Sequence, residues 1–217
     1  MSRKILFSNE FYYHIYNRGV DKRQIFIDKF DYTRFLESLR EFNQVEPVGS
    51  LYHLKKRQLR DAIPPAGGIA SLQRQVDIMA YCLNSNHYHL LIKQNKKRGI
   101  SEFMRKLSIG YTCYFNEKYK RSGSLFQGTF KAREVKSAHD LEKISVYINC
   151  NAEIHGIAKS ENWIWSSYLD YIGRRKGTLA DKKDVLESFT SHLEYKNFSK
   201  EIIGDIKEVK KLMKDNF

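Results

Sequence analysis

The sequence predicts an α+β fold in which helices pack on one face of an antiparallel sheet. Three features indicate it: an aromatic segment with period-two alternation near the start, two adjacent apolar runs around a short turn, and several segments with helical spacing. Strands joined by local hairpins, without regular strand–helix alternation, favour an antiparallel sheet. With 217 residues, 41% of them hydrophobic, the chain is long enough for one sizeable core.

The first predicted strand runs through an aromatic segment near residue 11. Phe11, Tyr13 and Ile15 alternate with Tyr12, His14 and Tyr16, and the pattern ends at Asn17-Arg18-Gly19. A helix follows, in which apolar residues recur at helical spacing: Tyr32, Phe35, Leu36, Leu39 and Phe42. Proline and glycine then punctuate residues 46–75, which predicts a short strand near Leu51 and a basic loop.

Two apolar runs, residues 76–83 and 88–92, predict a central hairpin. They flank Asn84-Ser85-Asn86, a polar triplet suited to a tight turn. A helix is predicted over about residues 101–119, with short extended pieces after it. The third helix is predicted to start at Ser137, whose hydroxyl can cap it, and to end near His155-Gly156.

The chain is strongly basic. Its 38 Lys and Arg residues against 25 Asp and Glu give a net charge of +13, so a polyanion such as nucleic acid will be attracted. A protein that merely has a basic surface explains the charge equally well. Three cysteines without a CxxC pair, no signal peptide and no membrane-spanning run predict a cytoplasmic protein that contacts no membrane.

His87-Tyr88-His89 is the first candidate for a chemical site. Residues two apart on a strand point to the same face, so both imidazoles can meet one metal ion while Tyr88 turns into the core. By itself this triplet is weak evidence, because paired strand histidines are often only hydrogen-bonded.

Tyr147 and Asn151 form a second candidate pair on the third predicted helix. Four residues apart, they lie one above the other on one helix face, where a phenol and an amide oxygen can act together. The structural alternative is a half-buried boundary tyrosine beside a polar residue near the helix end.

Several sequence blocks together resemble the single-tyrosine HUH transposase family, and in particular the REP-associated tyrosine transposases. The blocks occur in the order of that family over about residues 11–171: YYHIYNRG from Tyr12, NHYHLLI from Asn86, LFQG through Lys131-Ala132, and WIWSSY from Trp163. The resemblance implies a ferredoxin-like antiparallel sheet with helices behind it. It also implies an enzyme that cleaves and rejoins single-stranded, hairpin-forming DNA.

The resemblance assigns roles to individual residues. His87 and His89 take the places of the metal-binding histidines, Tyr147 that of the nucleophile, and Asn151 that of the third metal ligand, for Mg²⁺ or Mn²⁺. Ala152 stands where the family usually has proline, and Asn149 is an alternative to Asn151. Tyr111 and Tyr114 are alternative tyrosines, although their spacing favours core packing.

DNA contacts are expected from basic residues near the blocks. We expect them from Arg18, Lys96, Lys97, Arg98, Arg105 and Lys131. Two other functions stay open: a domesticated nucleic-acid-binding protein without activity, and a two-histidine phosphoesterase that uses water.

The chain is expected to comprise a catalytic domain over residues 1–175 and a basic, helical C-terminal extension over 176–217. It is expected to act as a monomer or homodimer.

Overall fold

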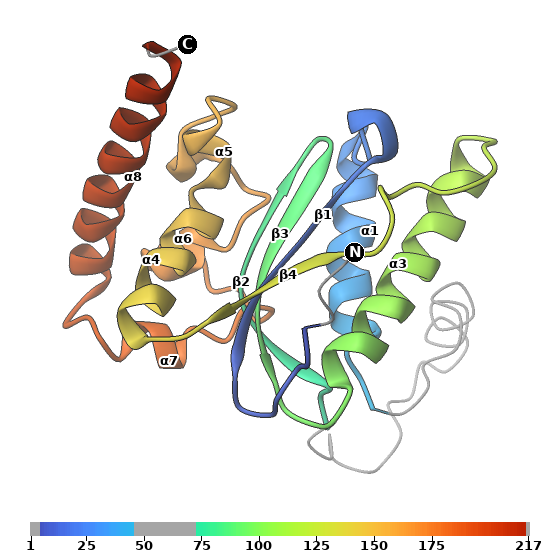
Figure 1. Ribbon diagram of the computed structural model, residues 1–217, viewed down its shortest axis with the longest axis horizontal. Helices are drawn as coiled ribbons and strands as arrows, with labels where there is room; N and C mark the ends of the chain where they lie inside the picture. The colour runs from blue at the N-terminus through green and yellow to red at the C-terminus, as the bar shows by residue number, and fades with distance from the viewer. Residues whose placement is uncertain (1–4, 46–72, 216–217) are drawn as a thin grey trace.

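The computed structural model describes residues 5–45 and 73–215, so the strand predicted near Leu51 lies outside the described residues. The described elements follow one another as Figure 1 shows. They are β1 (Tyr12–Arg18), η1 (Val20–Lys22), α1 (Lys29–Glu41), β2 (Val76–Asn84), β3 (His87–Gln94), α3 (Gly99–Lys118), β4 (Lys131–Val135), α4 (Ala138–Asn149), α5 (Asn151–Ile154), η2 (Ser160–Asn162), α6 (Tyr168–Tyr171), α7 (Lys183–Leu186) and α8 (His192–Asp215).

The four strands form one sheet in the order β2-β3-β1-β4, and every neighbouring pair is antiparallel. With α1 and α3 as the connections, this is the ferredoxin-like arrangement predicted above. In the register between β1 and β3, Tyr16 lies opposite His89 and Arg18 opposite His87. Side chains directly opposite each other share a face, so these four point to the same side of the sheet.

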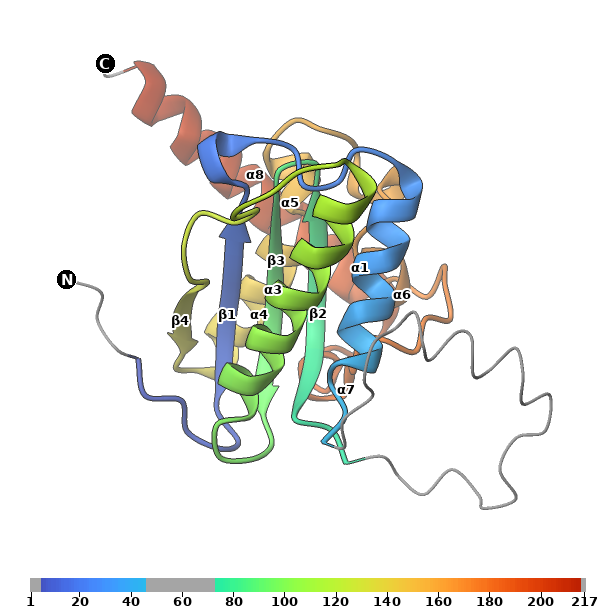
Figure 2. The same ribbon diagram turned by 90° about the vertical axis from the view of Figure 1, so that its right-hand side faces the viewer.

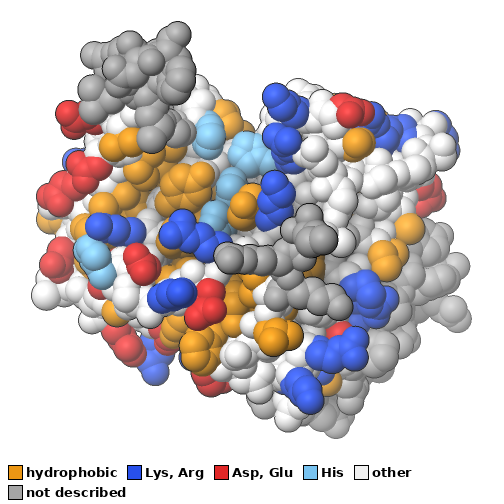
Figure 3. Space-filling view, in the orientation of Figure 1, with side chains coloured by type: hydrophobic (Ala, Val, Ile, Leu, Met, Phe, Trp, Pro, Cys, Tyr) orange, Lys and Arg blue, Asp and Glu red, His pale blue; other side chains and the backbone are white. Residues whose placement is uncertain are grey.

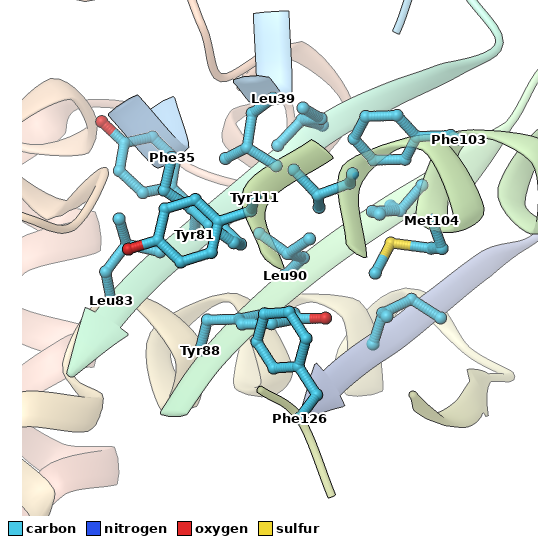
Figure 4. Packing of buried hydrophobic residues seen from close by; sticks show 14 of the residues in the cluster. Phe35, Leu39, Tyr81, Leu83, Tyr88, Leu90, Phe103, Met104, Tyr111 and Phe126 are labelled. Carbon is cyan, nitrogen blue, oxygen red and sulfur yellow. The ribbon is translucent and has the colours of Figure 1, made fainter. Parts of the chain in front are cut away.

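One face of the sheet packs against α1 and α3. Buried aromatic and aliphatic side chains from both helices and from the central strands form this core, and Figure 4 shows the packing. Tyr88 is fully buried here, as its place between the two histidines predicted. Tyr111 donates a hydrogen bond from its hydroxyl to the carbonyl of Ile25 at 2.6 Å, which joins α3 to the loop before α1.

The other face of the sheet is also covered, so the prediction of helices on one face only was wrong. Helices α4 to α8 lie on the side opposite α1 and α3 (Figures 1 and 2). A second core forms there around Met79, Cys82, Leu91 and Ile148. The physical reason is visible in β2, where buried apolar residues occupy both faces of the strand, as in strands that are covered on both sides.

Helix α4 begins as the sequence predicted, at Ser137. The Ser137 hydroxyl accepts a hydrogen bond from the Asp140 amide at 3.0 Å and so caps the helix. The predicted single helix is divided at Cys150, whose backbone leaves helical geometry before the short α5 resumes it. The position at which the related family usually has proline is occupied by Ala152, which is buried in α5.

None of the described helices is both long and apolar enough to cross a bilayer.

Candidate active site

Three histidines from two neighbouring strands gather on the sheet face that α4 covers. His87 and His89 come from the start of β3, and His14 comes from β1, two positions from Tyr16, the residue opposite His89. The ring centroids of His87 and His89 lie 5.2 Å apart, and those of His89 and His14 lie 5.0 Å apart. In Figure 3 histidine side chains gather near the middle of the face, with lysine and arginine side chains along one side.

The orientation of His87 is set by its neighbour in the turn. Nδ1 of His87 lies 2.6 Å from Oδ1 of Asn86, whose amide group in turn donates to the Lys22 carbonyl. Since Oδ1 can only accept, the Nδ1 of His87 carries the proton, and Nε2 of the neutral ring keeps its lone pair. Burial lowers the pKa of His87 and favours this neutral form.

Asn151 places an amide oxygen beside that lone pair. Oδ1 of Asn151 lies 3.3 Å from Nε2 of His87, and both accept from the amide nitrogen of Asn84, at 2.7 and 2.9 Å. Two lone-pair donors therefore converge on one electropositive group, where Asn84 and Asn151 are fully buried and His87 is half-buried. The amide nitrogen of Asn151 has no hydrogen-bond partner among the described residues.

The donor set suits a divalent cation. Two ligands on one ion, each about 2.1 Å from it and at roughly a right angle, are about 3 Å apart, which agrees with the spacing of His87 and Asn151. In the described part of the chain no three His, Cys, Asp or Glu side chains form a metal-binding group. A metal site here therefore needs the amide oxygen of Asn151 in addition to the histidines.

His89 is held by a hydrogen bond to another histidine. Nδ1 of His89 lies 2.7 Å from Nε2 of His14, and both side chains are buried. Burial lowers the pKa of His89 well below its usual value and that of His14 to about 4, so both rings are neutral at pH 7. With Nδ1 engaged, Nε2 is the nitrogen of His89 that is available to a metal ion.

Tyr147 lies over the histidines from α4. Its half-buried ring meets the rings of His14 and His89 edge-on, with centroids 5.8 Å away in each case. Burial raises the pKa of the phenol, and the nearby Asn151 side chain acts in the opposite direction. Tyr147 and Asn151 thus lie together, as their four-residue spacing implied.

The alternative residues lie elsewhere. The sheet separates Tyr111 and Tyr114 from the histidines, since both belong to the core between α1 and α3. Asn149 points away from the site: its amide group donates to the Tyr195 hydroxyl at 2.9 Å, and its oxygen accepts from the Ser167 hydroxyl. Of the two asparagines, Asn151 is therefore the one beside His87.

The basic residues expected to contact DNA fall into two groups. Arg18 lies opposite His87 and Lys131 opposite Tyr16, so both extend from the sheet on the histidine side. Lys96, Lys97 and Arg98 follow the far end of β3, and Arg105 is exposed on α3, which covers the sheet face opposite the histidines and lies in front of the sheet in Figure 2. The structure brings only Arg18 and Lys131 near the histidines.

The neighbours of the site that were not predicted from the sequence include His14, Asn84, Arg133 and His155, whose ring centroid lies 5.7 Å from that of His87. Arg133 lies directly opposite His14 on β4, and its charge contributes to the low pKa of His14. His14 did carry a signal, because it alternates with Tyr12 and Tyr16 on one face of the first strand. The partner strand that brings it to His89 was not evident.

Comparison with known proteins finds a similar family and a similar fold. Residues 60–151 match the family model described as "Transposase IS200 like". Seventeen chains among the solved structures match. One is a REP-associated tyrosine transposase bound to a REP hairpin: it is 14% identical, has a TM-score of 0.54, and the match covers 83% of this chain and 93% of that chain.

A second solved structure, a candidate transposase from Deinococcus radiodurans R1, is 12% identical with a TM-score of 0.38, and the match covers 73% of this chain and 99% of that one. No curated protein matches. The resemblance to single-tyrosine transposases is confirmed by the family match, which spans both β3 histidines, Tyr147 and Asn151, and by the shared fold. Residues 60–151 of this chain are therefore similar to the IS200-like transposase family.

Proposed function

We propose that this protein cleaves and rejoins single-stranded, hairpin-forming DNA, with Tyr147 as the nucleophile and with His87, His89 and Asn151 as ligands of a divalent ion. The observation that carries the proposal is the position of Tyr147, edge-on against His89 and one helical turn before Asn151. A nucleophile, two imidazoles and an amide oxygen thus meet on one face of the sheet. A family match over residues 60–151 supports it independently.

The reaction exchanges one phosphodiester for another. The Tyr147 oxygen attacks the scissile phosphorus and gives up its proton, a bond from that oxygen to phosphorus forms, and the bond to the 3′-oxygen breaks. The 3′-oxygen takes up a proton and leaves as a hydroxyl, while the other fragment stays joined to Tyr147 through its 5′-phosphate. Attack by another 3′-hydroxyl reverses these changes and rejoins a strand without an external energy source.

The residues around Tyr147 favour this step in different ways. A tyrosine phenol is protonated at neutral pH, and burial raises the pKa of Tyr147 further, so Tyr147 must lose its proton as it attacks. When bound, Mg²⁺ or Mn²⁺ supplies positive charge that polarises the phosphate and offsets the charge developing on its oxygens. Imidazole ligands suit Mn²⁺ better than Mg²⁺.

The substrate class rests on charge and on the related structure. A REP hairpin is bound in the REP-associated transposase of the same fold. In this chain Arg18 and Lys131 extend from the sheet beside the histidines, where they can hold phosphates of the strand being cut. All three cysteines are free thiols, which suits the reducing cytoplasm where we place the activity.

The experiment that tests the proposal is the change Tyr147→Phe. It removes the attacking oxygen and leaves the ring packing and the proposed metal ligands in place. With a 3′-labelled hairpin oligonucleotide and Mn²⁺, the wild-type protein should carry the label on a denaturing gel, because the 3′ fragment stays bound through its 5′-phosphate. Tyr147→Phe should lose both the adduct and cleavage while keeping DNA binding.

The matched control is Tyr114→Phe, on the other side of the sheet, which should keep the adduct. An adduct with Tyr147→Phe would show that another residue is the nucleophile. Cleavage without any adduct would favour the water-using phosphoesterase. Specific hairpin binding by the wild type without cleavage would favour the domesticated binding protein.

A further inference from the structure

The hydrogen bond between two imidazoles at the centre of the site needs an explanation. Nε2 of His14 and Nδ1 of His89 are 2.7 Å apart, the rings lie 29° from parallel, and the two side chains are only 6% and 8% exposed. One proton lies between these nitrogens, so one ring donates and the other accepts. Which ring donates decides what the rest of His89 can do.

The two arrangements have opposite consequences for His89. If His89 donates from Nδ1, its Nε2 keeps a lone pair and can bind a cation. If His14 donates from Nε2, the proton of neutral His89 lies on its own Nε2, which then has no lone pair to offer. The neighbouring ligand His87 has its proton on Nδ1, directed to Asn86, and the first arrangement gives His89 the same form.

We propose that His14 is a positioning residue: it accepts the Nδ1 proton of His89 and thereby holds His89 in the tautomer whose Nε2 can bind the metal ion. This inference rests on the proposed function, because it concerns the same metal site. Metal-binding histidines generally donate their second N–H to an oxygen acceptor, and here an imidazole nitrogen takes that place.

The residues packed around His14 also hold the orientation of its imidazole ring. Tyr16 stacks on His89 with centroids 5.6 Å apart and lies 5.0 Å from His14, while the Tyr147 ring meets both histidines edge-on. Aromatic neighbours therefore limit rotation of both imidazoles. His14 belongs to the central strand β1, so the acceptor is held by a paired backbone and not by a loop.

The test compares two replacements of His14. His14→Phe keeps a ring of similar size but offers no acceptor, so the Nδ1–H of His89 is left without a partner. His14→Gln keeps an acceptor at a comparable reach from the strand. We expect His14→Phe to weaken Mn²⁺ binding about 10- to 100-fold, measured by calorimetry, and His14→Gln to restore most of it.

The matched control is His139→Gln, which removes an exposed imidazole elsewhere on the molecule and should leave Mn²⁺ binding unchanged. Nitrogen-15 NMR of the metal-free wild-type protein gives a second readout that needs no variant, with the His89 signals assigned from a His89→Gln sample. We expect the His89 proton on Nδ1.

A proton on Nε2 of His89, or wild-type Mn²⁺ affinity in a folded His14→Phe protein, would overturn the inference. If calorimetry detects no Mn²⁺ binding by the wild type and gives the same result for His87→Ala, the proposed metal site is wrong, and not the role of His14. The NMR tautomer still decides the role of His14 in that case.

Discussion

Asn84 places an N–H donor where the proposed function requires a cation. Its amide nitrogen donates to the lone pairs of both His87 and Asn151, and its side chain is fully buried. A divalent ion between these two ligands supplies the same positive charge, so ion binding requires the Asn84 amide to move or turn its oxygen inward. Asn84 therefore helps to keep the ligands in place in the metal-free protein.

Asn84→Asp replaces this donor with a carboxylate beside two acceptors. Without metal, it should destabilise the protein by about 1–3 kcal/mol, because three acceptors then face one another in a buried corner. With Mn²⁺, the carboxylate is a favourable neighbour, and affinity should rise about tenfold. Thermal unfolding with EDTA and with Mn²⁺ measures both effects.

The control for Asn84→Asp is Asn116→Asp on α3, behind the sheet, where the amide bonds to Gly123 and Arg121. Mn²⁺ should raise the melting temperature of Asn116→Asp no more than that of wild type. A smaller rise for Asn84→Asp than for wild type would show that no cation binds beside Asn84.

Among the residues of the candidate site, those that belong to a local sequence pattern could be predicted. The spacing of His87 and His89 placed them on one strand face, and the spacing of Tyr147 and Asn151 placed those on one helix face. Asn84 belongs to no such pattern, and the alternation that places His14 on a strand face does not show which residues it contacts. Their partners depend on the register of β1 against β3 and on the position of α5, which are tertiary features.

At the scale of elements, α8 and the loop after α5 hold α5, the short helix that carries Asn151, in place. The carboxylate of Glu153 in α5 accepts from the Ser160 amide and hydroxyl at 2.9 and 3.0 Å, and it also pairs with Lys159 and with Lys207 of α8. These contacts lower the pKa of Glu153 from 4.5 to about 2. The C-terminal helix thus takes part in holding α5 against the sheet.

Glu153→Gln should lower the free energy of unfolding at pH 7. The full pKa change corresponds to about 3 kcal/mol, and we expect about 1–2 kcal/mol because Lys159 and Lys207 are solvent-exposed. A depressed carboxyl pKa stabilises the fold above the unfolded-state pKa, and this stabilisation disappears as pH falls through the folded-state value. The difference from wild type should therefore shrink between about pH 4.5 and pH 2, as followed by urea denaturation.

The matched control is Glu187→Gln, directly after α7, where the Glu187 side chain is 64% exposed. It should change stability little at either pH. A pH-independent difference between wild type and Glu153→Gln would mean that the carboxylate charge is not what holds α5.

Element boundaries followed the sequence where a local signal exists. The Ser137 cap marked the start of α4, and the polar triplet marked the turn between β2 and β3. The break at Cys150 was not predicted, because the low helix propensity of Asn149, Cys150 and Asn151 is a weak signal beside the helical spacing of the apolar residues around them. The helices on the second sheet face were not predicted either. Apolar residues on both faces of β2 indicate that both faces are buried, but they do not indicate which helix covers each face.

At the scale of the whole molecule, the net charge of +13 attracts DNA but does not choose where it binds. The ferredoxin-like sheet divides the basic residues by face and by end. Arg18, Lys131 and Arg133 lie on the histidine face, and within the described residues none of them is paired with a carboxylate. The cluster Lys96-Lys97-Arg98 lies beyond the opposite end of β3.

Two triple variants distinguish direct phosphate contacts from the general electrostatic attraction between the protein and DNA. Each variant lowers the net charge by three, so the general attraction falls equally in both. Replacing Arg18, Lys131 and Arg133 with glutamine should weaken hairpin binding and reduce the slope of log affinity against log salt by about 2, because each lost phosphate contact accounts for about 0.7. The same change at Lys96, Lys97 and Arg98 should alter that slope by less than about 0.7.

Fluorescence anisotropy in a Tyr147→Phe background measures binding without cleavage. Equal slopes for the two variants would mean that the DNA does not lie across the histidine face, and a larger change for the second would place it at the far end of β3.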